Sequence, residues 1–366
     1  MKRMGRRERK RRVFALIISA VVLCFLAAGC SLPQSGDSEA SGGSNSSETV
    51  QEKNAGQVQR TVFAMNTMMN LRAFGENAEA AIEAAEEEIR HLDTLLQRGE
   101  ESSEIYQLNS SGSREVSEET LSVIKRALEI AEATDGAFDP SIAPAADLWG
   151  FYGQNFRVPS PDEISSVLPT IGWKKISIEG NRVTLQPGTK IDLGGIAKGF
   201  LSGKLMEIFR DHGVETGIVS LGGNVQTLGE KTDGSIWKVA LQDPDDPDRY
   251  LGQLSVADKA VVTSGSYQQH FEKDGKEYHH ILDPKTGWPA DSGLTSVTII
   301  CENGARADGL STALFVMGAE RGIAYWKDNE GFDAIFVTAD RKIYVTEGLE
   351  GNFECVDSYE IVRKSS

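Results

Sequence analysis

Two residues spaced four apart near residue 310 are suited to holding a metal ion. Asp308 and Thr312 fall in a segment with helical character, where positions i and i+4 share one face. A carboxylate and a hydroxyl side by side can supply two hard oxygen ligands to Mg²⁺, while phosphate oxygens and water fill the other positions. The alternative is that Asp308 caps the helix and Thr312 bonds back to a backbone carbonyl. By itself the pair does not decide between these two roles.

A glycine turn that leads into a helix offers a possible anion site. Residues 191–200 have the sequence IDLGGIAKGF, which predicts a short strand over residues 191–193, a turn and then a helix. Free N–H groups and the positive end of the dipole at such a helix start suit a pyrophosphate, and Lys198 adds a positive charge. The segment matches neither a Walker A loop nor a dinucleotide fingerprint. A tight strand–helix turn with no ligand explains it as well.

A histidine pair is the third feature with chemical potential. Only five histidines occur in the chain, and His279 and His280 are adjacent, directly before turn-forming residues 283–287. In an extended segment the two side chains point to opposite sides, so they do not chelate one metal together. One of them could act as an acid or base. The alternative is a surface pair beside a turn.

Two further segments combine glycine with polar residues. Residues 134–140 form a polar turn around Phe138, which could instead be a core anchor after a helix. Residues 220–224, SLGGN, could bring backbone close to a ligand, although an ordinary glycine turn accounts for them equally well.

The elements that would position these residues follow from periodicity. A strand with a turn at residues 64–67 is expected over residues 61–74, and Ser117 is expected to cap a helix that ends before Gly136. Helices and strands mix without strict alternation, which favours an α+β fold with a mixed sheet and packed helices. The predicted helices span residues 76–97, 118–133, 197–212, 305–317 and 320–327. The other predicted strands span residues 176–178, 183–185, 217–221, 237–241, 251–256, 260–263, 294–301, 334–338 and 342–345.

Composition narrows the classes of protein. The chain has 366 residues, 40% of them hydrophobic, which is ordinary for a globular protein. The net charge of −16 argues against nucleic acid as a partner, because phosphate backbones need a basic surface. Four cysteines are too few for a disulfide scaffold of this length. Cys301 and Cys355 could pair or remain as buried thiols.

The N-terminus is typical of an exported, lipid-anchored protein. Basic residues 2–12 precede an apolar run over residues 13–28, as in a secretory signal. Small residues directly before Cys30 resemble the lipobox of bacterial lipoproteins. We therefore predict a signal peptide at residues 1–29, a lipidated Cys30 with a flexible Ser/Gly/Glu tether at residues 30–59, and a folded body at residues 60–366.

That organisation predicts attachment to the extracytoplasmic face of the cell membrane. Loss of residues 1–29 removes seven net positive charges and takes the formal charge from −16 to −23. The anchor must then be the lipid, because no polybasic patch remains in the signal's place. An uncleaved N-terminal anchor with a chance cysteine is the alternative.

Taken together and in this order, the motifs resemble the ApbE family of FAD:protein FMN transferases. The matching pieces span most of the chain after the tether, and many members of that family are lipoproteins. They are AMNT at 64–67, residues 103–109, DGAFDP at 135–140, DLGGIAKG at 192–199, SLGGN at 220–224, HILDP with a following Thr-Gly at 280–287, and Ala-Asp followed by Thr-Ala at 307–313.

The resemblance implies a reaction and a role for each matching residue. FAD would be split at its pyrophosphate, its FMN half joined to a Thr hydroxyl of an acceptor flavoprotein, and AMP released. His280 would take the proton from that hydroxyl. The implied Mg²⁺ ligands are the side chains of Asp308 and Thr312 and the carbonyl of Gly195. The implied FAD contacts are Met65, Ala137, Phe138, Asp139, Asp192, Lys198 and Leu282.

Two departures from the family pattern concern the flavin environment. Many members have a small residue after the methionine, in a Met-Gly-Thr string, whereas this chain has Asn66. Many also have an aromatic residue before the Ser103 segment, whereas residues 97–100 are QRGE. Two competing functions remain open at this point: a Mg²⁺-dependent FAD pyrophosphatase that gives FMN and AMP, and an FAD-binding lipoprotein without catalysis.

Overall fold

The computed structural model describes residues 56–364. The predicted signal peptide and Cys30 lie outside the described residues, as does the predicted tether up to residue 55. The first strand begins at Gln57, so three of its residues fall within the range predicted as tether. Within the described part of the chain, no helix is both long and apolar enough to cross a membrane.

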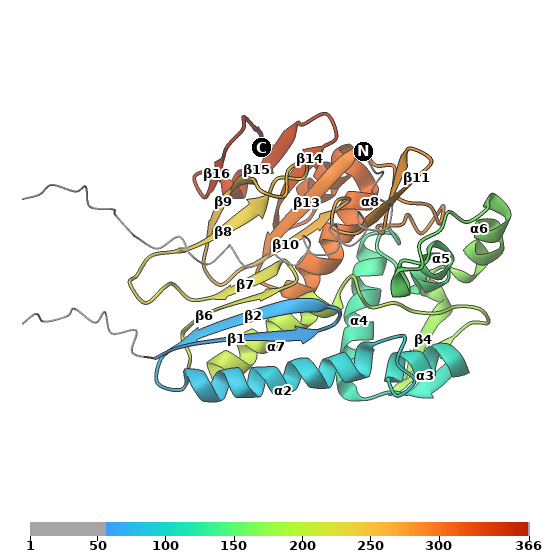
Figure 1. Cartoon of the computed structure of the whole chain (residues 1–366), viewed down its shortest axis with the longest axis horizontal. Helices are drawn as coiled ribbons and strands as arrows, with labels where there is room; N and C mark the ends of the chain where they lie inside the picture. Colours follow the sequence, from blue (N-terminus) through green and yellow to red (C-terminus); the bar gives the residue numbers. More distant parts are fainter. Residues whose placement is uncertain (1–55, 365–366) are drawn as a thin grey trace, which may run out of the picture.

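A nine-stranded sheet forms the centre of the molecule (Figure 1). Neighbouring strands are antiparallel except for the last pair, so the sheet is mixed, as the predicted α+β class requires. In spatial order its strands are β1 (Gln57–Ala64), β2 (Thr67–Phe74), β6 (Thr216–Leu221), β7 (Asn224–Leu228), β10 (Ala260–Gly265), β13 (Leu294–Cys301), β14 (Asp333–Thr338), β15 (Ile343–Thr346) and β17 (Glu360–Val362).

Three smaller sheets complete the strand inventory of the described residues. A three-stranded sheet contains β16, β9 and β8, another contains β3, β5 and β4, and β11 pairs with β12 as a hairpin. Their bounds are β3 (Ser113–Glu115), β4 (Ile176–Glu179), β5 (Arg182–Leu185), β8 (Trp237–Gln242), β9 (Tyr250–Val256), β11 (His270–Lys273), β12 (Lys276–His279) and β16 (Phe353–Cys355).

The two faces of the large sheet are covered differently. Helices α2, α7 and α8 form a layer on one face, with α7 between the other two. The β8–β9–β16 sheet packs on the other face, where Val239 and Leu254 meet Val261 of β10 in one apolar cluster. The helices are α2 (Ala78–Leu96), α3 (Glu104–Ser111), α4 (Glu118–Ala133), α5 (Ala143–Trp149), α6 (Pro161–Val167), α7 (Ala197–Asp211) and α8 (Gly304–Asp328).

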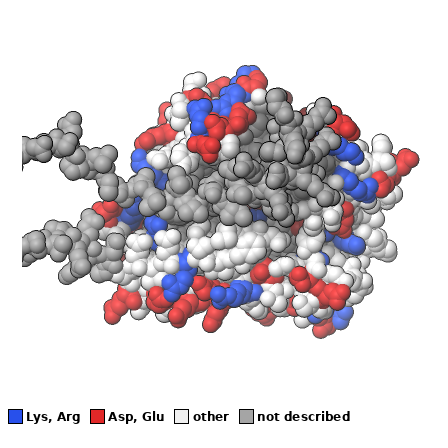
Figure 2. Space-filling view, viewed as in Figure 1, with Lys and Arg blue, Asp and Glu red and all other residues white. Residues whose placement is uncertain are grey.

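The predicted helices are confirmed, with one difference in α8. Ile82, Ala85, Ile89 and Leu92 of α2 are all buried, as their spacing predicts. The exposed face of α2 carries Glu79, Glu83 and Glu87, and Figure 2 shows acidic side chains along this edge of the body with Lys and Arg between them. The two C-terminal helices predicted at 305–317 and 320–327 form one element that breaks at Gly318, where φ is 81°. Glycine adopts this left-handed conformation without steric cost.

Local turn and cap signals were also predicted correctly. The Ser117 hydroxyl accepts a hydrogen bond from the Thr120 N–H at the start of α4. Met65 and Asn66, with φ of 47° and 59°, form the two-residue turn between β1 and β2. A hairpin of this length favours Gly or Asn where φ is positive, which explains why Asn66 can stand where the family often has glycine.

The predicted strand over residues 191–193 is wrong. Those residues belong to no strand, because the side chain of Asn109 takes the place of a neighbouring strand. Its amide oxygen accepts from the Ile191 N–H at 2.7 Å, and its amide nitrogen donates to the Ile191 carbonyl at 2.9 Å. The segment is therefore held by this side chain from α3 and by a backbone hydrogen bond from the Asp192 N–H to the Pro140 carbonyl at 2.7 Å, rather than by a ladder. Cys301 and Cys355 are both free thiols.

Candidate active site

Close contact between α7 and α8 brings Asp308 to the start of α7. A Cβ on Gly199 would lie 2.2 Å from the Gly304 carbonyl oxygen and 2.5 Å from the Asp308 Cβ, so only glycine fits at this crossing. The Asp308 carboxylate, almost fully buried, accepts the Gly199 N–H at 2.8 Å. Asn303, not Asp308, caps α8. Asp308 therefore places a negative charge on the positive end of the neighbouring helix.

Thr312 lies one turn beyond Asp308, beside the glycine turn that precedes α7. A Cβ on Gly195 would be 3.7 Å from the Thr312 Oγ1 and 3.1 Å from the Phe138 ring. This geometry brings together Gly195, Phe138 and Thr312, which are far apart in the sequence. The carboxylate, hydroxyl and nearby backbone carbonyl are all hard oxygen donors, the set that Mg²⁺ prefers.

The residues around Thr312 include a hydroxyl that the sequence analysis missed. Ser264, at the end of β10, lies 3.3 Å from the Thr312 Oγ1 and 2.8 Å from the Ser311 Oγ. No local pattern marks Ser264, because the contact joins residues 48 positions apart. Within residues 56–364 there is no cluster of three or more His, Cys, Asp or Glu that could hold a metal. The candidate metal ligands are therefore a mixed oxygen set with a single carboxylate.

His280 follows β12 and is held in one tautomer. Its Nδ1 lies 3.1 Å from the Gln269 carbonyl oxygen, which can only accept, so the proton is on Nδ1 and Nε2 keeps its lone pair. Burial lowers the pKa of His280 to about 4, the Gln269 contact opposes that shift, and the charge of Lys198 adds to it. A neutral imidazole with a free Nε2 is ready to accept a proton at neutral pH.

The two histidines face different surroundings, as the extended segment predicts. His279 packs edge-on against Phe315 of α8, with ring centroids 5.5 Å apart. His280 instead faces Phe151, with centroids 6.5 Å apart. They do not form a shared chelating pair.

Asp192 takes part in an ion-pair cluster that the sequence analysis did not predict. Its Oδ2 lies 2.7 Å from Arg98 Nε, while its Oδ1 accepts the Gly194 N–H at 2.8 Å. Arg98 also donates to Asp147 at 2.7 Å. Asp192 thus connects Arg98 to the glycine turn. Lys198, in the first turn of α7, donates to the Gly194 carbonyl at 3.2 Å.

The segment at residues 137–139 is largely committed to packing and turn formation. Ala137 and Phe138 are buried in the main core. The Asp139 carboxylate accepts from the Ser141 N–H and hydroxyl and from the Trp173 N–H, and burial raises its pKa. Of this segment, the edge of the Phe138 ring is the part that reaches Gly195.

Met65 and Leu282 lie in different parts of the fold. Met65 is partly buried against the main core, and its N–H donates to Asp93 at 2.9 Å. Leu282 belongs to a separate cluster around Trp149 and forms an isolated bridge with Pro289. The structure thus places these two expected FAD contacts on separate elements.

These features define an α+β protein in which oxygen donors of Asp308, Thr312 and Asp192 lie with Lys198 around the glycine turn and the start of α7. A model of the ApbE family matches residues 65–336, and the chain belongs to that family. The FAD:protein FMN transferase of Treponema pallidum is 31% identical over 334 residues, which cover 83% of this chain and 91% of that protein. The FAD:protein FMN transferase of Klebsiella pneumoniae is 34% identical over 284 residues, or 75% and 87%. The crystal structure of the ApbE protein of Thermotoga maritima has a TM-score of 0.77 at 36% identity and covers 81% of this chain and 99% of that one.

Proposed function

We propose that this protein transfers the FMN half of FAD to a Thr hydroxyl of an acceptor flavoprotein and releases AMP, with Mg²⁺ as the metal. The observation that carries the proposal is the position of Asp308, which reaches from α8 to the first turn of α7 beside Gly195 and Thr312. Relatives named FAD:protein FMN transferase support the same reaction class.

The residues supply what phosphoryl transfer needs. Asp308, Thr312 and the carbonyl of Gly195 would hold Mg²⁺, which neutralises charge on the pyrophosphate when it is bound. Lys198 and the N-terminus of α7 add fixed positive potential where a polyanion must sit in an otherwise acidic body. Asp192, Phe138 and the backbone of residues 137–139 would orient the nucleotide.

His280 has the properties required of a general base. Its Nε2 would take the proton from the acceptor Thr hydroxyl as the oxygen attacks the phosphorus next to the flavin. The Gln269 carbonyl keeps the Nδ1 proton in place and so fixes Nε2 as the accepting atom.

The proposal extends to location. Cys30 would carry the lipid after cleavage, and the tether would let the folded body reach acceptor proteins at the extracytoplasmic face of the cell membrane. Globomycin-sensitive processing and metabolic labelling with a fatty acid, both absent in Cys30→Ser, would test this directly.

The activity is tested with residues 31–366, FAD, Mg²⁺ and an acceptor domain that carries a candidate Thr. The expected result is an added FMN mass on the acceptor, one AMP per label, and loss of both with EDTA. FMN and AMP without acceptor labelling would replace the transferase by an FAD pyrophosphatase. Intact FAD that only co-purifies would replace it by an FAD-binding lipoprotein.

A further inference from the structure

Two carboxylates lie close to the glycine turn where the proposed function has to hold a polyanion. Asp192 directly precedes this turn and its side chain is 26% exposed, while the side chain of Asp147 in α5 is 40% exposed. Like charges repel, and the pyrophosphate of FAD is itself negative. The fold must therefore offset the charge of these carboxylates if the start of α7 is to bind a nucleotide.

Arg98 is the cation that the two carboxylates share. Its Nη1 donates to the Asp147 Oδ1 at 2.7 Å, and its Nε lies 2.7 Å from the Asp192 Oδ2. The second contact is an ion pair without hydrogen-bond geometry, because neither Nε nor Nη2 of Arg98 has a hydrogen-bond partner. The interaction between Arg98 and Asp192 is therefore chiefly one of charge.

The guanidinium of Arg98 is buried and covered by an aromatic ring. The Arg98 side chain is only 7% exposed, and its Cζ lies 4.3 Å from the centroid of the Tyr152 ring. Gly99 leaves room for that ring, because a Cβ there would lie 2.1 Å from the Tyr152 hydroxyl oxygen. Exclusion of water strengthens the interaction of this charge with the carboxylates beside it.

Asp192 connects Arg98 to the candidate active site. Its Oδ1 accepts the Gly194 N–H at 2.8 Å, and the Gly194 carbonyl accepts from Lys198 at 3.2 Å. The next residue, Gly195, lies beside Thr312. A carboxylate has about four acceptor positions, so the exposed side of Asp192 keeps lone pairs that donor groups of a nucleotide can use.

We propose that Arg98 is a positioning residue for FAD: its charge offsets Asp147 and Asp192 and holds the Asp192 carboxylate where it accepts hydrogen bonds from sugar hydroxyl groups of the nucleotide. This inference rests on the proposed function, because it assumes that FAD is the substrate. One positive and two negative charges give this cluster a net charge of −1, and loss of Arg98 makes it −2 beside the pyrophosphate. Arg98 does not touch the nucleotide and acts through Asp192.

The test measures FAD binding to the full-length protein in detergent by isothermal titration, with EDTA present so that metal binding does not contribute. Arg98→Met keeps an unbranched side chain under the Tyr152 ring and removes the charge, so FAD affinity should fall about tenfold, the scale of one interaction with a charged group. Arg98→Lys keeps the charge and should bind FAD within about threefold of the wild type. Equal losses in two folded variants would overturn the charge-based role.

Arg341→Met is the matched control, because Arg341 also pairs with several aspartates, namely Asp243, Asp245 and Asp357. It should lower the melting temperature and leave FAD affinity unchanged. If Arg98 has only a structural role, Arg98→Met gives that same pattern. Asp147→Asn removes a negative charge and keeps the pair of Arg98 with Asp192, so its FAD affinity should not fall; a tenfold loss there would overturn the proposed action through Asp192.

A double-mutant cycle tests directly whether Arg98 acts through Asp192. Asp192→Asn should weaken FAD binding, because it removes an acceptor oxygen and the charge that Arg98 offsets. The double variant Arg98→Met/Asp192→Asn should then bind FAD no more weakly than Asp192→Asn alone, whereas losses that add would show that Arg98 acts independently of Asp192. Unchanged FAD affinity in Arg98→Met overturns the positioning role while the proposed function stands. A wild-type protein that does not bind FAD overturns both.

Discussion

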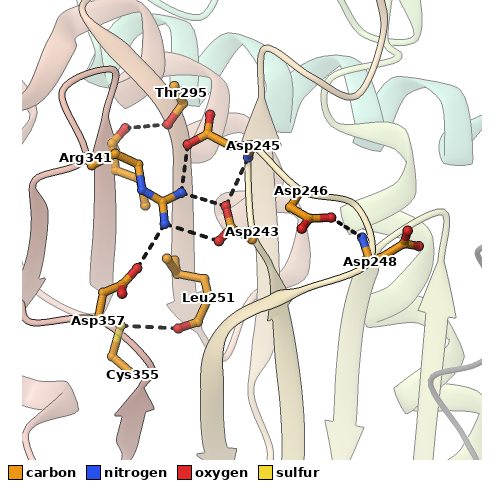
Figure 3. Close-up of polar contacts among 10 residues, drawn as sticks. Asp243, Asp245, Asp246, Asp248, Leu251, Thr295, Arg341, Cys355 and Asp357 are labelled. Atoms are coloured by element: carbon orange, nitrogen blue, oxygen red, sulfur yellow. Dashed lines mark hydrogen bonds and ion pairs between the residues drawn. The ribbon is translucent and has the colours of Figure 1, made fainter.

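Arg98 and Arg341 each contact more than one aspartate, but they differ in how many of their N–H groups have an acceptor. Arg341 donates four hydrogen bonds, to both oxygens of Asp243 and to one oxygen each of Asp245 and Asp357 (Figure 3). Arg98 donates one, to Asp147, and pairs in charge with Asp192, while its Nη2 has no partner. Both Nη atoms of Arg341 therefore have acceptors, whereas the Nη2 of Arg98 has none.

The two clusters also differ in the segments that they join. Arg341 lies in the β14–β15 turn. Its ion pairs connect that turn to the β8–β9 connection, through Asp243 and Asp245, and to the segment after β16, through Asp357 (Figure 3). The Arg98 cluster lies beside the glycine turn and the candidate Mg²⁺ ligands. A buried donor without an acceptor is a place where a ligand or an ordered water could complete the hydrogen bonding, whereas a cluster with all its bonds made offers no such place.

The largest loss of FMN transfer is expected from a substitution at Asp308, which lies in the candidate active site and not in the Arg341 cluster. Asp308→Asn can still accept the Gly199 N–H but loses the charge that would hold Mg²⁺, so transfer should fall about a thousandfold or more. The melting temperature should change little. Acceptor labelling and calorimetry measure the two quantities, with Asp243→Asn as the matched variant in the other region. Wild-type transfer by Asp308→Asn would remove Asp308 from the metal site.

His280 should give the next largest effect. His280→Gln removes the proton acceptor and should slow transfer about a hundredfold to a thousandfold while FAD binding is kept. The control is His270→Gln, since His270 is an exposed histidine on β11. Loss of FAD binding in His280→Gln would make this a structural residue instead.

The pH dependence of transfer provides a separate check on His280. Because its folded pKa is lowered to about 4, the imidazole stays neutral as the pH falls through 6.5. The acidic limb of kcat/KM should therefore lie near pH 4 rather than near the ordinary histidine pKa of about 6.5. A limb at pH 6.5 that disappears in His280→Gln would show that the histidine is more solvated than its packing indicates.

Sequence patterns predicted what is local and missed what is not. The one-face placement of Asp308 and Thr312 follows from i, i+4 spacing, and the buried stripe of α2 follows from its 3–4 period. Arg98 was passed over because its partners Asp147 and Asp192 are 49 and 94 residues away in the numbering. No periodicity reports a contact of that kind.

The false strand at residues 191–193 shows a second limit. The apolar alternation there did predict extended backbone, but a strand also needs a neighbouring strand to pair with. The Asn109 side chain bonds both backbone groups of Ile191, and the Asp192 N–H bonds the Pro140 carbonyl, so these backbone groups are satisfied without a ladder. The short strand β17 was not predicted, because three residues are too few to show a pattern and only the pairing with β15 makes them a strand.

A moderate effect on stability, with none on binding, is expected in the Arg341 cluster. Asp243 is 2% exposed and accepts two hydrogen bonds from Arg341. Asp243→Asn should lower the free energy of unfolding by about 2 kcal/mol, the scale of a charged hydrogen bond, and leave FAD affinity unchanged. Urea unfolding and FAD titration measure the two; a change in FAD affinity would show that the Arg341 cluster also acts on the nucleotide site.

Acid should weaken the same cluster in a defined direction. The hydrogen bonds from Arg341 lower the pKa of Asp243 below its ordinary value, so this carboxylate binds fewer protons in the folded than in the unfolded state. Its contribution is present above the unfolded pKa of about 4 and is lost as the pH falls through the lower folded pKa. The stability difference between wild type and Asp243→Asn should therefore shrink below pH 4 in urea unfolding, and a constant difference would contradict the charge-based account.

The smallest effect is expected at Ser264, which touches the candidate site only through Thr312. Ser264→Ala removes the hydroxyl 3.3 Å from the Thr312 Oγ1 and so releases the orientation of that proposed ligand. The Mg²⁺ concentration for half-maximal transfer should rise about tenfold or less, as for other residues that orient metal ligands, while FAD binding in EDTA is unchanged. Ser266→Ala, two residues further along the chain, is the control because its hydroxyl instead bonds the Thr295 carbonyl. Equal Mg²⁺ dependence in the two variants would mean that Thr312 is positioned by α8 alone, and the polar network of the active site would then end at its proposed ligands.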